Sequence, residues 1–453
     1  MRRIHRTKAA VGLLLAGLVG LAGGFAPAAE EEGENEPLIQ MIVELVGDAD
    51  RDMRALGLQQ IREEVPGEAA TKRFAALVTE LPPEGQAELL EALGDRQDAA
   101  ARPAVLEMLE SEEEAVRAAA IRALGGLGGE ADVALLAKSS AATAAAERLA
   151  ARESLVRLRG EGIDAAIVDT LGEGEPGMRA ELLGVLAQRN ARGALGTVLE
   201  SAEDPESSVR VAALGALRFL ADENHAAAIV KILKGIGDDP ERRKAELALL
   251  AVCSRSGQAC AEAIIAGMAD ADVPARIALL HGLGRAGGAA SLEAILGRLE
   301  DDDESVRDEA VRMLSFSSDP AAAPHLLEIA KTTQSLRHQV LAIRGLVRLS
   351  GPRGEEPAKV DTLAEVMSLA KRPEEKRLVL GMLGGTAGPE SLELATSALD
   401  DEALAGEAAL ASVMIAEKMK GKADKVRAAM EKVGKSAKDA QVRQRAQKVL
   451  ESL

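Results

Sequence analysis

A short phrase centred on an arginine recurs along this 453-residue chain at nearly constant intervals. In each copy, aliphatic side chains follow the arginine four and seven residues later, as Val311 and Leu314 follow Arg307. Because these spacings put both side chains on one stripe of a helix, the phrase predicts a helix rather than a strand. The arginines in this position are Arg54, Arg117, Arg179, Arg210, Arg243, Arg276 and Arg307.

An acidic residue stands four positions before each of these arginines. At the start of a helix, a carboxylate favours the positive end of the helix dipole, and it can pair with an arginine one turn later. The acids are Asp50, Glu113, Glu175, Glu206, Asp239, Asp272 and Asp303. We therefore interpret each acid and arginine as the structural anchor of one repeat.

The repeat has a period of 31 to 33 residues from Arg179 onward, and the two earlier steps, of 63 and 62 residues, are close to twice that. We place one further copy at Gln86, which Leu90 and Leu93 follow, and a degenerate copy within residues 141–158. A fixed period of this length is typical of stacked two-helix units. Such a unit cannot bury its apolar face alone, so neighbouring units must stack into a continuous core.

The copies become looser after Arg307, where Arg337, Lys376 and Gly406 take the arginine's place. Residues 351–359, rich in Gly and Pro, lengthen one step and predict a hinge or an inserted loop. The span 38–453 holds about thirteen units of roughly 32 residues. The predicted fold class is therefore all-α, an α–α superhelix of about thirteen helix-turn-helix repeats.

Several of these phrases, such as SAEDPESSVRVAALGAL from Ser201, resemble HEAT repeats, especially the short bacterial type also called PBS-lyase HEAT-like. In that family, aspartate and arginine side chains form a ladder between successive repeats. The residues that match the ladder aspartate are Asp48, Asp204, Asp270 and Asp301. The resemblance covers nearly all of the chain after its N-terminal segment and implies an armadillo/HEAT-like solenoid. It implies little about activity, because one fold hosts many functions.

The N-terminal segment has the features of a secretory signal peptide in residues 1–28. A basic start precedes an apolar run, and Ala26 to Ala28 offer a small-residue cleavage site. The alternative is an uncleaved membrane helix, since the run is just long enough to span a bilayer. Residues 29–37 read as a disordered acidic lead-in. We therefore expect export to the periplasm or the extracellular space, with no membrane insertion after signal removal.

Charge and composition argue against several classes of partner. The whole chain has a formal net charge of −18, and removing residues 1–28, with four basic and no acidic residues, leaves −22. Such a charge disfavours nucleic acid and anionic membranes. The only aromatic residues after the signal are Phe74, Phe219 and Phe316, so modes that depend on base or sugar stacking are nearly excluded.

The last segment, residues 415–453, is basic in an otherwise acidic chain. It contains eleven Lys and Arg against five Asp and Glu. One interpretation is a polar capping repeat, which a solenoid needs at its end. The other is a docking surface for an acidic partner or for the acidic body of a second copy, which would produce self-association.

No constellation for catalysis, cofactor binding or metal binding emerges from the residue pattern, so we predict none of these. The histidines at 225, 281, 325 and 338 do not share a position in the repeat, and no HExxH motif is present. Cys253 and Cys260 flank a predicted turn, and in an exported protein they could form a disulfide. The alternative is two small buried apolar side chains.

These observations predict a non-catalytic scaffold that binds another protein on the concave face of the solenoid. A self-assembling structural protein is the first alternative. The resemblance also implies a weaker one, an accessory of the PBS-lyase type that handles a tetrapyrrole.

Overall fold

The computed structural model describes residues 35–352, 359–419 and 423–453, which form helices joined by short turns and contain no strand. The chain divides into two compact units, Met1–Ala194 and Leu195–Leu453. The first unit contains α3 (Glu36–Val46), α4 (Arg51–Glu63), α5 (Glu68–Ala76), α6 (Pro83–Arg96), α7 (Arg102–Glu107), α8 (Glu114–Leu127), α9 (Val133–Ser140), α10 (Ala145–Arg157), α11 (Ile163–Glu173) and α12 (Pro176–Gln188).

The second unit continues the same alternation of helices. It contains α13 (Leu195–Ser201), α14 (Ser207–Leu220), α15 (Ala226–Gly235), α16 (Asp239–Ser256), α17 (Ala261–Met268), α18 (Val273–Ala286), α19 (Gly288–Gly297), α20 (Glu304–Phe316), α21 (Ala323–Thr332), α22 (Leu336–Ser350), α23 (Val360–Leu369), α24 (Pro373–Leu383), α25 (Pro389–Ser397), α26 (Ala405–Lys418), α27 (Ala423–Ser436) and α28 (Ala440–Glu451).

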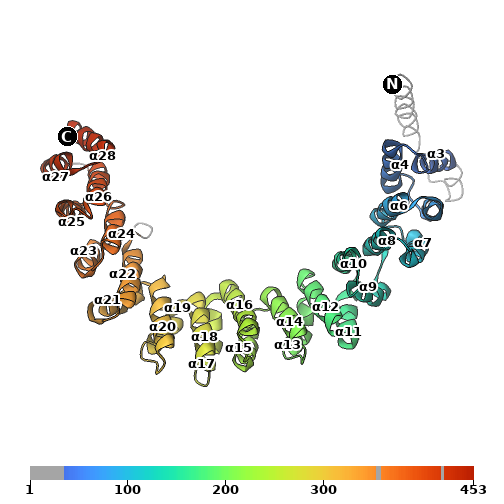
Figure 1. Cartoon of the computed structure of the whole chain (residues 1–453), viewed down its shortest axis with the longest axis horizontal. Coiled ribbons are helices and arrows are strands. Elements are labelled where there is room, and N and C mark those ends of the chain that lie inside the picture. The colour runs from blue at the N-terminus through green and yellow to red at the C-terminus, as the bar shows by residue number, and fades with distance from the viewer. Residues whose placement is uncertain (1–34, 353–358, 420–422) are drawn as a thin grey trace, which may run out of the picture. The chain divides into compact units, whose positions relative to one another are not determined.

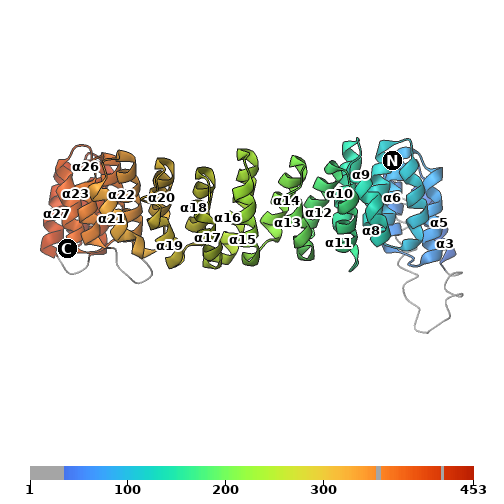
Figure 2. The ribbon, with the colours of Figure 1, turned by 90° about the horizontal axis from the view of Figure 1, so that it is seen from below.

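Each odd-numbered helix forms a pair with the even-numbered helix that follows it. The described residues hold five such pairs in the first unit and eight in the second, so the prediction of about thirteen helix-turn-helix repeats is confirmed. Within each unit, the even-numbered helices pack side by side as one layer and the odd-numbered helices form a second layer (Figures 1 and 2).

The core of each unit lies between these two layers. An aliphatic residue in the C-terminal half of the even-numbered helix, seven positions after the anchor position, is fully buried in eleven of the repeats. These residues are Ile61, Leu93, Leu124, Leu155, Leu186, Leu217, Leu249, Leu283, Leu314, Leu346 and Leu383. Burial of one such side chain contributes about 1.5–3 kcal/mol, so the repeated stripe is the main source of cohesion between helices.

Glycine lets three even-numbered helices of the first unit approach closely. A Cβ atom at Gly94 of α6 would lie 2.7 Å from the Cα of Ala123 in α8, and one at Gly125 would lie 2.8 Å from the Cα of Ser154 in α10. Because the neighbouring atoms are backbone, they cannot move aside as a flexible side chain can. The backbones of α6, α8 and α10 therefore pack at a spacing that requires glycine.

Some predicted segments fall outside the described residues. These are the signal peptide (1–28), most of the acidic lead-in (29–37) and residues 353–358 of the suggested hinge. At the edge of the lead-in, Glu36 and Pro37 already belong to α3, two residues before the predicted first helix. Among the described helices, none combines the length and the apolar character needed to cross a membrane.

Candidate functional site

The predicted acids lie at the N-terminal ends of the even-numbered helices. Six of the seven occupy the N-cap position, namely Asp50, Glu113, Glu175, Glu206, Asp272 and Asp303. The carboxylate of Asp50 accepts a hydrogen bond from the backbone N–H of Asp52 at 2.8 Å, and that of Asp272 accepts one from Ala275, also at 2.8 Å. These bonds satisfy backbone donors that have no partner within the helix.

The anchor arginines close the turn that precedes their own helix. Arg117 Nη1 donates to the carbonyl oxygens of Ser111 at 2.7 Å and Glu112 at 2.9 Å. The same two bonds, to the carbonyls five and six residues earlier, are made by Arg54, Arg210 and Arg307. The recurring phrase therefore encodes one local structure, a turn held by an arginine from the first turn of the next helix.

Two arginines in this role differ from those predicted. In the degenerate copy, Arg148 donates to the carbonyls of Ala142 and Thr143. This copy was hard to recognise because Arg152 stands four residues after Arg148, where the other copies have an aliphatic residue. In α16 the role belongs to Arg242, which donates to the carbonyl of Ile236.

Asp239 and Arg243 are therefore one residue out of register in α16. The N-cap is Asp238, whose carboxylate accepts from the N–H of Glu241 at 3.1 Å, and Asp239 is the first helical residue. Arg243 has 63% of its side chain exposed, against 8% for Arg242. The prediction failed here because the sequence DDPERR fits two registers equally well, and only the position of the cap distinguishes them.

The anchor arginines also connect successive repeats. Arg117 pairs with Glu147 at 2.7 Å, Arg210 with Glu241 at 2.7 Å, and Arg242 with Asp272 at 3.3 Å. In each pair the carboxylate belongs to the next repeat, whereas the sequence had suggested pairing with the acid one turn earlier.

The remaining anchors and the ladder aspartates have varied partners. Arg276 lies 3.5 Å from Asp301 of the next repeat, which is an aspartate–arginine contact of the kind that the HEAT resemblance implies. Asp270 pairs instead with Lys234. Asp48 and Asp204 each accept a backbone N–H two residues later, in the turn before their helix. Arg179 lies in α12 and is half-buried.

A second kind of bridge, not predicted from the sequence, caps the C-terminal ends of even-numbered helices. Arg189 at the end of α12 donates to the carbonyls of Leu155, Val156 and Leu158 at the end of α10, at 2.8–3.0 Å. A cation at a helix C-terminus satisfies free carbonyls and interacts favourably with the helix dipole. The cations that bridge back to the preceding even-numbered helix in this way are Arg96, Arg189, Arg255, Arg348 and Lys418.

The middle of the even-numbered layer in the second unit contains a charge cluster around His281, whose side chain is only 18% exposed. Its Nδ1 lies 2.6 Å from Glu246 Oε1 in α16, and its Nε2 lies 2.8 Å from Glu309 Oε1 in α20. Arg243 and Arg312 complete the cluster by pairing with Glu246 and Glu309, respectively. Three consecutive even-numbered helices thus share one network of alternating charges.

The protonation of this cluster follows from its geometry. Burial disfavours the imidazolium, but the hydrogen bonds to Glu246 and Glu309 outweigh it and raise the pKa of His281 to about 9. Burial also opposes ionisation of the two glutamates, yet the hydrogen bond from His281 lowers the pKa of both. His281 is therefore a charged, structural group at neutral pH.

The other histidines are not gathered with His281. In the turn between α14 and α15, His225 Nδ1 lies 2.7 Å from Asp222 Oδ1. His338 Nε2 in α22 lies 2.7 Å from Asp308 Oδ1 in α20. His325 is exposed at the start of α21. Within the ranges that the structure describes, no group of three or more His, Cys, Asp or Glu side chains is placed to hold a metal ion.

Cys253 and Cys260 are both buried free thiols. Of the two alternatives left open by the sequence, the structure thus has the pair of small buried side chains. Burial raises the pKa of Cys253 to about 12 and also raises the pKa of Cys260. Because the thiolate is the reactive form, neither residue is poised as a nucleophile at neutral pH.

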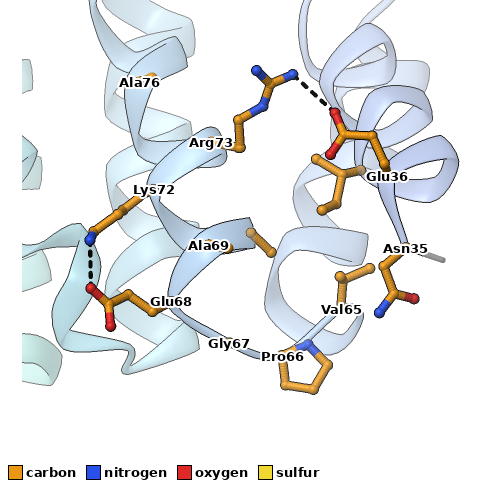
Figure 3. A pocket seen from close by; sticks show the side chains of 12 residues that line it. Asn35, Glu36, Val65, Pro66, Gly67, Glu68, Ala69, Lys72, Arg73 and Ala76 are labelled. Carbon is orange, nitrogen blue, oxygen red and sulfur yellow. Dashed lines mark ion pairs between the residues drawn. The ribbon is translucent and has the colours of Figure 1, made fainter. Parts of the chain in front are cut away.

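A surface cavity of about 620 Å³ lies between α3 and α5, near the start of the described chain. Figure 3 shows that its charged side chains pair with each other, Lys72 with Glu68 and Arg73 with Glu36. All four are more than half exposed, and such pairs contribute little free energy. The arrangement offers no convergent group for catalysis.

Comparisons with known proteins agree with this architecture. The family model described as HEAT repeats matches residues 70–156 and 261–346. No curated protein matches the sequence.

The similar solved structures include two of Kap121p, one bound to Ste12p (14% identity, TM-score 0.55) and one bound to Nup53p (14% identity, TM-score 0.54). Each alignment covers 92% of this chain and 53% of Kap121p, so the chain spans about half the length of that protein. At this identity the likeness concerns the fold alone. The repeat phrase, the two helical layers and the family match lead to one conclusion: the chain contains HEAT repeats and has an α-solenoid fold.

Proposed function

We propose that this chain is a non-catalytic scaffold that binds another protein on the face formed by its even-numbered helices. The observation that carries the proposal is the placement of large exposed apolar side chains. Among the described residues, six lie on even-numbered helices, namely Leu149, Phe219, Phe316, Leu336, Leu378 and Leu410. One, Ile265, lies on an odd-numbered helix, and Leu453 follows α28.

This distribution favours one face as the binding face. Single exposed apolar residues are ordinary on a protein surface, whereas their concentration on one side marks a site of interaction. The solved structures of Kap121p bound to Ste12p and to Nup53p support the proposal, because a protein of similar fold binds other proteins there.

The test compares matched variants on the two faces. Phe316→Ser with Leu378→Ser changes the even-numbered face, and Ile265→Ser changes the odd-numbered face at the large apolar side chain that is exposed there. We expect proteins that are crosslinked to the wild-type chain in its native cells to be lost from the first variant and retained by the second. Equal recovery with both variants would reject the even-numbered face as the binding site.

We also propose that residues 1–28 direct export, on the evidence of their sequence pattern. The mass of the protein purified from its native source tests this directly. Cleavage after Ala28 removes the apolar run, whereas a chain that retains Met1 and remains with the membranes would contradict the proposal.

Self-assembly through the basic segment 415–453 is the alternative function. Part of that charge is already engaged within the chain, because Lys432 pairs with Asp400, Lys438 with Glu402 and Arg445 with Glu417. These contacts favour the capping role. Charge reversal of the exposed Lys425 and Lys435 tests the alternative, since sedimentation would show loss of oligomers only if the segment mediates assembly.

A further inference from the structure

We propose that the even-numbered face from α16 to α24 binds an acidic, extended segment of a partner protein that also carries apolar side chains. This inference rests on the proposed function and names the chemistry of its partner. It uses only the second unit.

The first observation is a local reversal of charge. Helices α16, α18, α20, α22 and α24 together contain thirteen Arg and Lys against eight Asp and Glu, in a chain whose net charge is −18. The even-numbered helices of the first unit, α4 to α12, contain ten of each. The positive character is therefore a property of this stretch and not of even-numbered helices in general.

The second observation is which partner of each ion pair faces solvent. The arginine side chains are exposed by 63% at Arg243, 61% at Arg337 and 52% at Arg344. Their carboxylate partners are much less exposed, at 8% for Glu246 and 1% for Glu375. The acids thus lie behind the arginines, so the surface that a ligand meets is formed by guanidinium groups.

The third observation is that exposed apolar side chains lie on the same helices as arginines of this surface. Phe316 follows Arg312 by one helical turn on α20, and it is 64% exposed. Leu336 directly precedes Arg337, and Leu378 directly follows Arg377; they are 50% and 45% exposed. A ligand that is only charged would leave these apolar groups in water, whereas an acidic segment with apolar residues would cover them.

The spacing of the helices suits an extended peptide. Packed helices lie about 8–10 Å apart, and an extended chain advances about 3.3 Å per residue, so one step between even-numbered helices matches roughly three peptide residues. Guanidinium groups also bind carboxylates through two parallel hydrogen bonds. A segment of roughly twelve residues with an acid at every third position would span the five helices.

A nucleic acid fits this surface less well. The turns that lead into the same helices are acidic, with Asp270 and Asp272 before α18 and Asp301 to Asp303 before α20. A wide polyanion that reached the arginines would approach these carboxylates, whereas a narrow peptide along the middle of the layer would not.

The test uses the full chain and a fluorescent twelve-residue peptide, (Glu-Leu-Asp) repeated four times, with anisotropy as the readout. Control probes are the same peptide with Lys in place of each acid, an oligoglutamate without leucine, and a single-stranded oligonucleotide. We expect the acidic apolar peptide to bind most tightly, and its affinity to fall with added salt.

The decisive variants form a matched pair. Arg243→Gln, Arg337→Gln and Arg344→Gln together should weaken binding of the acidic apolar peptide at least tenfold. Arg62→Gln, Arg122→Gln and Arg152→Gln alter arginines of ion pairs on the first unit's even-numbered helices and should change the affinity less than twofold. Unchanged thermal melting of both variants shows that the fold is retained.

Three outcomes would overturn the inference: no binding of the acidic peptide, equal loss with both sets of variants, or tighter binding of the oligonucleotide. Crosslinking of native partners separates this inference from the proposed function. If the first-unit set removes partners while the second-unit set does not, the scaffold function stands and this binding surface is wrong. If neither set nor the Phe316 and Leu378 variant removes them, the even-numbered face is rejected as the binding site, and the proposed function fails in that form.

Discussion

At the scale of the residue, charged side chains hold repeats together more specifically than the aliphatic stripe does. His281 is the clearest case, because it joins α16, α18 and α20 through one imidazolium between two glutamates. A buried charge is tolerated only when its partners compensate for lost hydration. Here both ring nitrogens donate to a carboxylate, so the cluster is stable only while the histidine is charged and the glutamates are ionised.

The stability of the second unit should therefore decrease as pH rises through the alkaline range. Because the pKa of His281 is raised to about 9 in the folded state, its contribution is complete below about pH 6.5, the value of an unperturbed histidine, and is lost as pH rises through about 9. The full effect is on the order of 3 kcal/mol.

Urea midpoints measured from pH 6 to 10 should fall more in wild type than in His281→Gln. His325→Gln, at an exposed histidine, should behave as wild type; parallel profiles for all three proteins would contradict the assignment.

The register of α16 gives a second residue-scale prediction. Arg242→Ala removes a buried side chain that bonds Ile236 and pairs with Asp272, and it should destabilise the fold by about 1–3 kcal/mol. Arg243→Ala removes an exposed arginine and should cost less than about 1 kcal/mol. Chemical denaturation followed by circular dichroism compares the two, and the reverse order would restore Arg243 as the anchor.

At the scale of the element, the sequence predicts helices well and their mutual contacts poorly. Helix type and number follow from the spacing of aliphatic residues, which is a local property. The repeats after α20 were harder to align because Gln339 and Ala408 occupy the position that arginine holds elsewhere. The predicted anchors Arg337 and Gly406 are exposed and lie two residues too early. Bridges such as that from Arg189 to α10 depend on the distance between repeats, which no local pattern specifies.

The close approach of α6 to α8 can be tested at glycine. Gly94→Ala places a methyl group 2.7 Å from the Cα of Ala123, so we expect a loss of about 1–3 kcal/mol from overpacking. Gly184→Ala, in α12, meets no atom within 4 Å and should instead stabilise its helix by about 0.5–1 kcal/mol. Thermal melts of the two variants should shift in opposite directions; a rise in melting temperature for Gly94→Ala would show that the helices can separate at no cost.

At the scale of the whole molecule, stability is distributed along a row of similar contacts. Each even-numbered helix contacts the even-numbered helices before and after it within its unit. In such a protein the stability is approximately a sum of repeat and nearest-neighbour terms. Damage to one repeat should therefore remain local.

Hydrogen exchange with mass spectrometry can measure this locality. Leu314→Ala empties a fully buried position in α20 and should cost about 2–5 kcal/mol. We expect faster exchange in α18, α20 and α22 and unchanged protection in α4 to α12. A uniform increase over both units would show a single cooperative fold instead.

The cations that cap helix ends have a consequence for synthesis of the chain. Arg96 caps α4, Arg189 caps α10 and Arg348 caps α20, and in each case the cation belongs to a later repeat than the helix it caps. The anchor arginine Arg117 likewise forms its ion pair with Glu147, which belongs to the following repeat. As the ribosome adds residues from the N-terminus onward, a repeat is thus completed only by its successor. We therefore expect a chain that emerges from its N-terminus to carry one incomplete repeat at its growing end, whether it emerges from a ribosome or from a membrane channel.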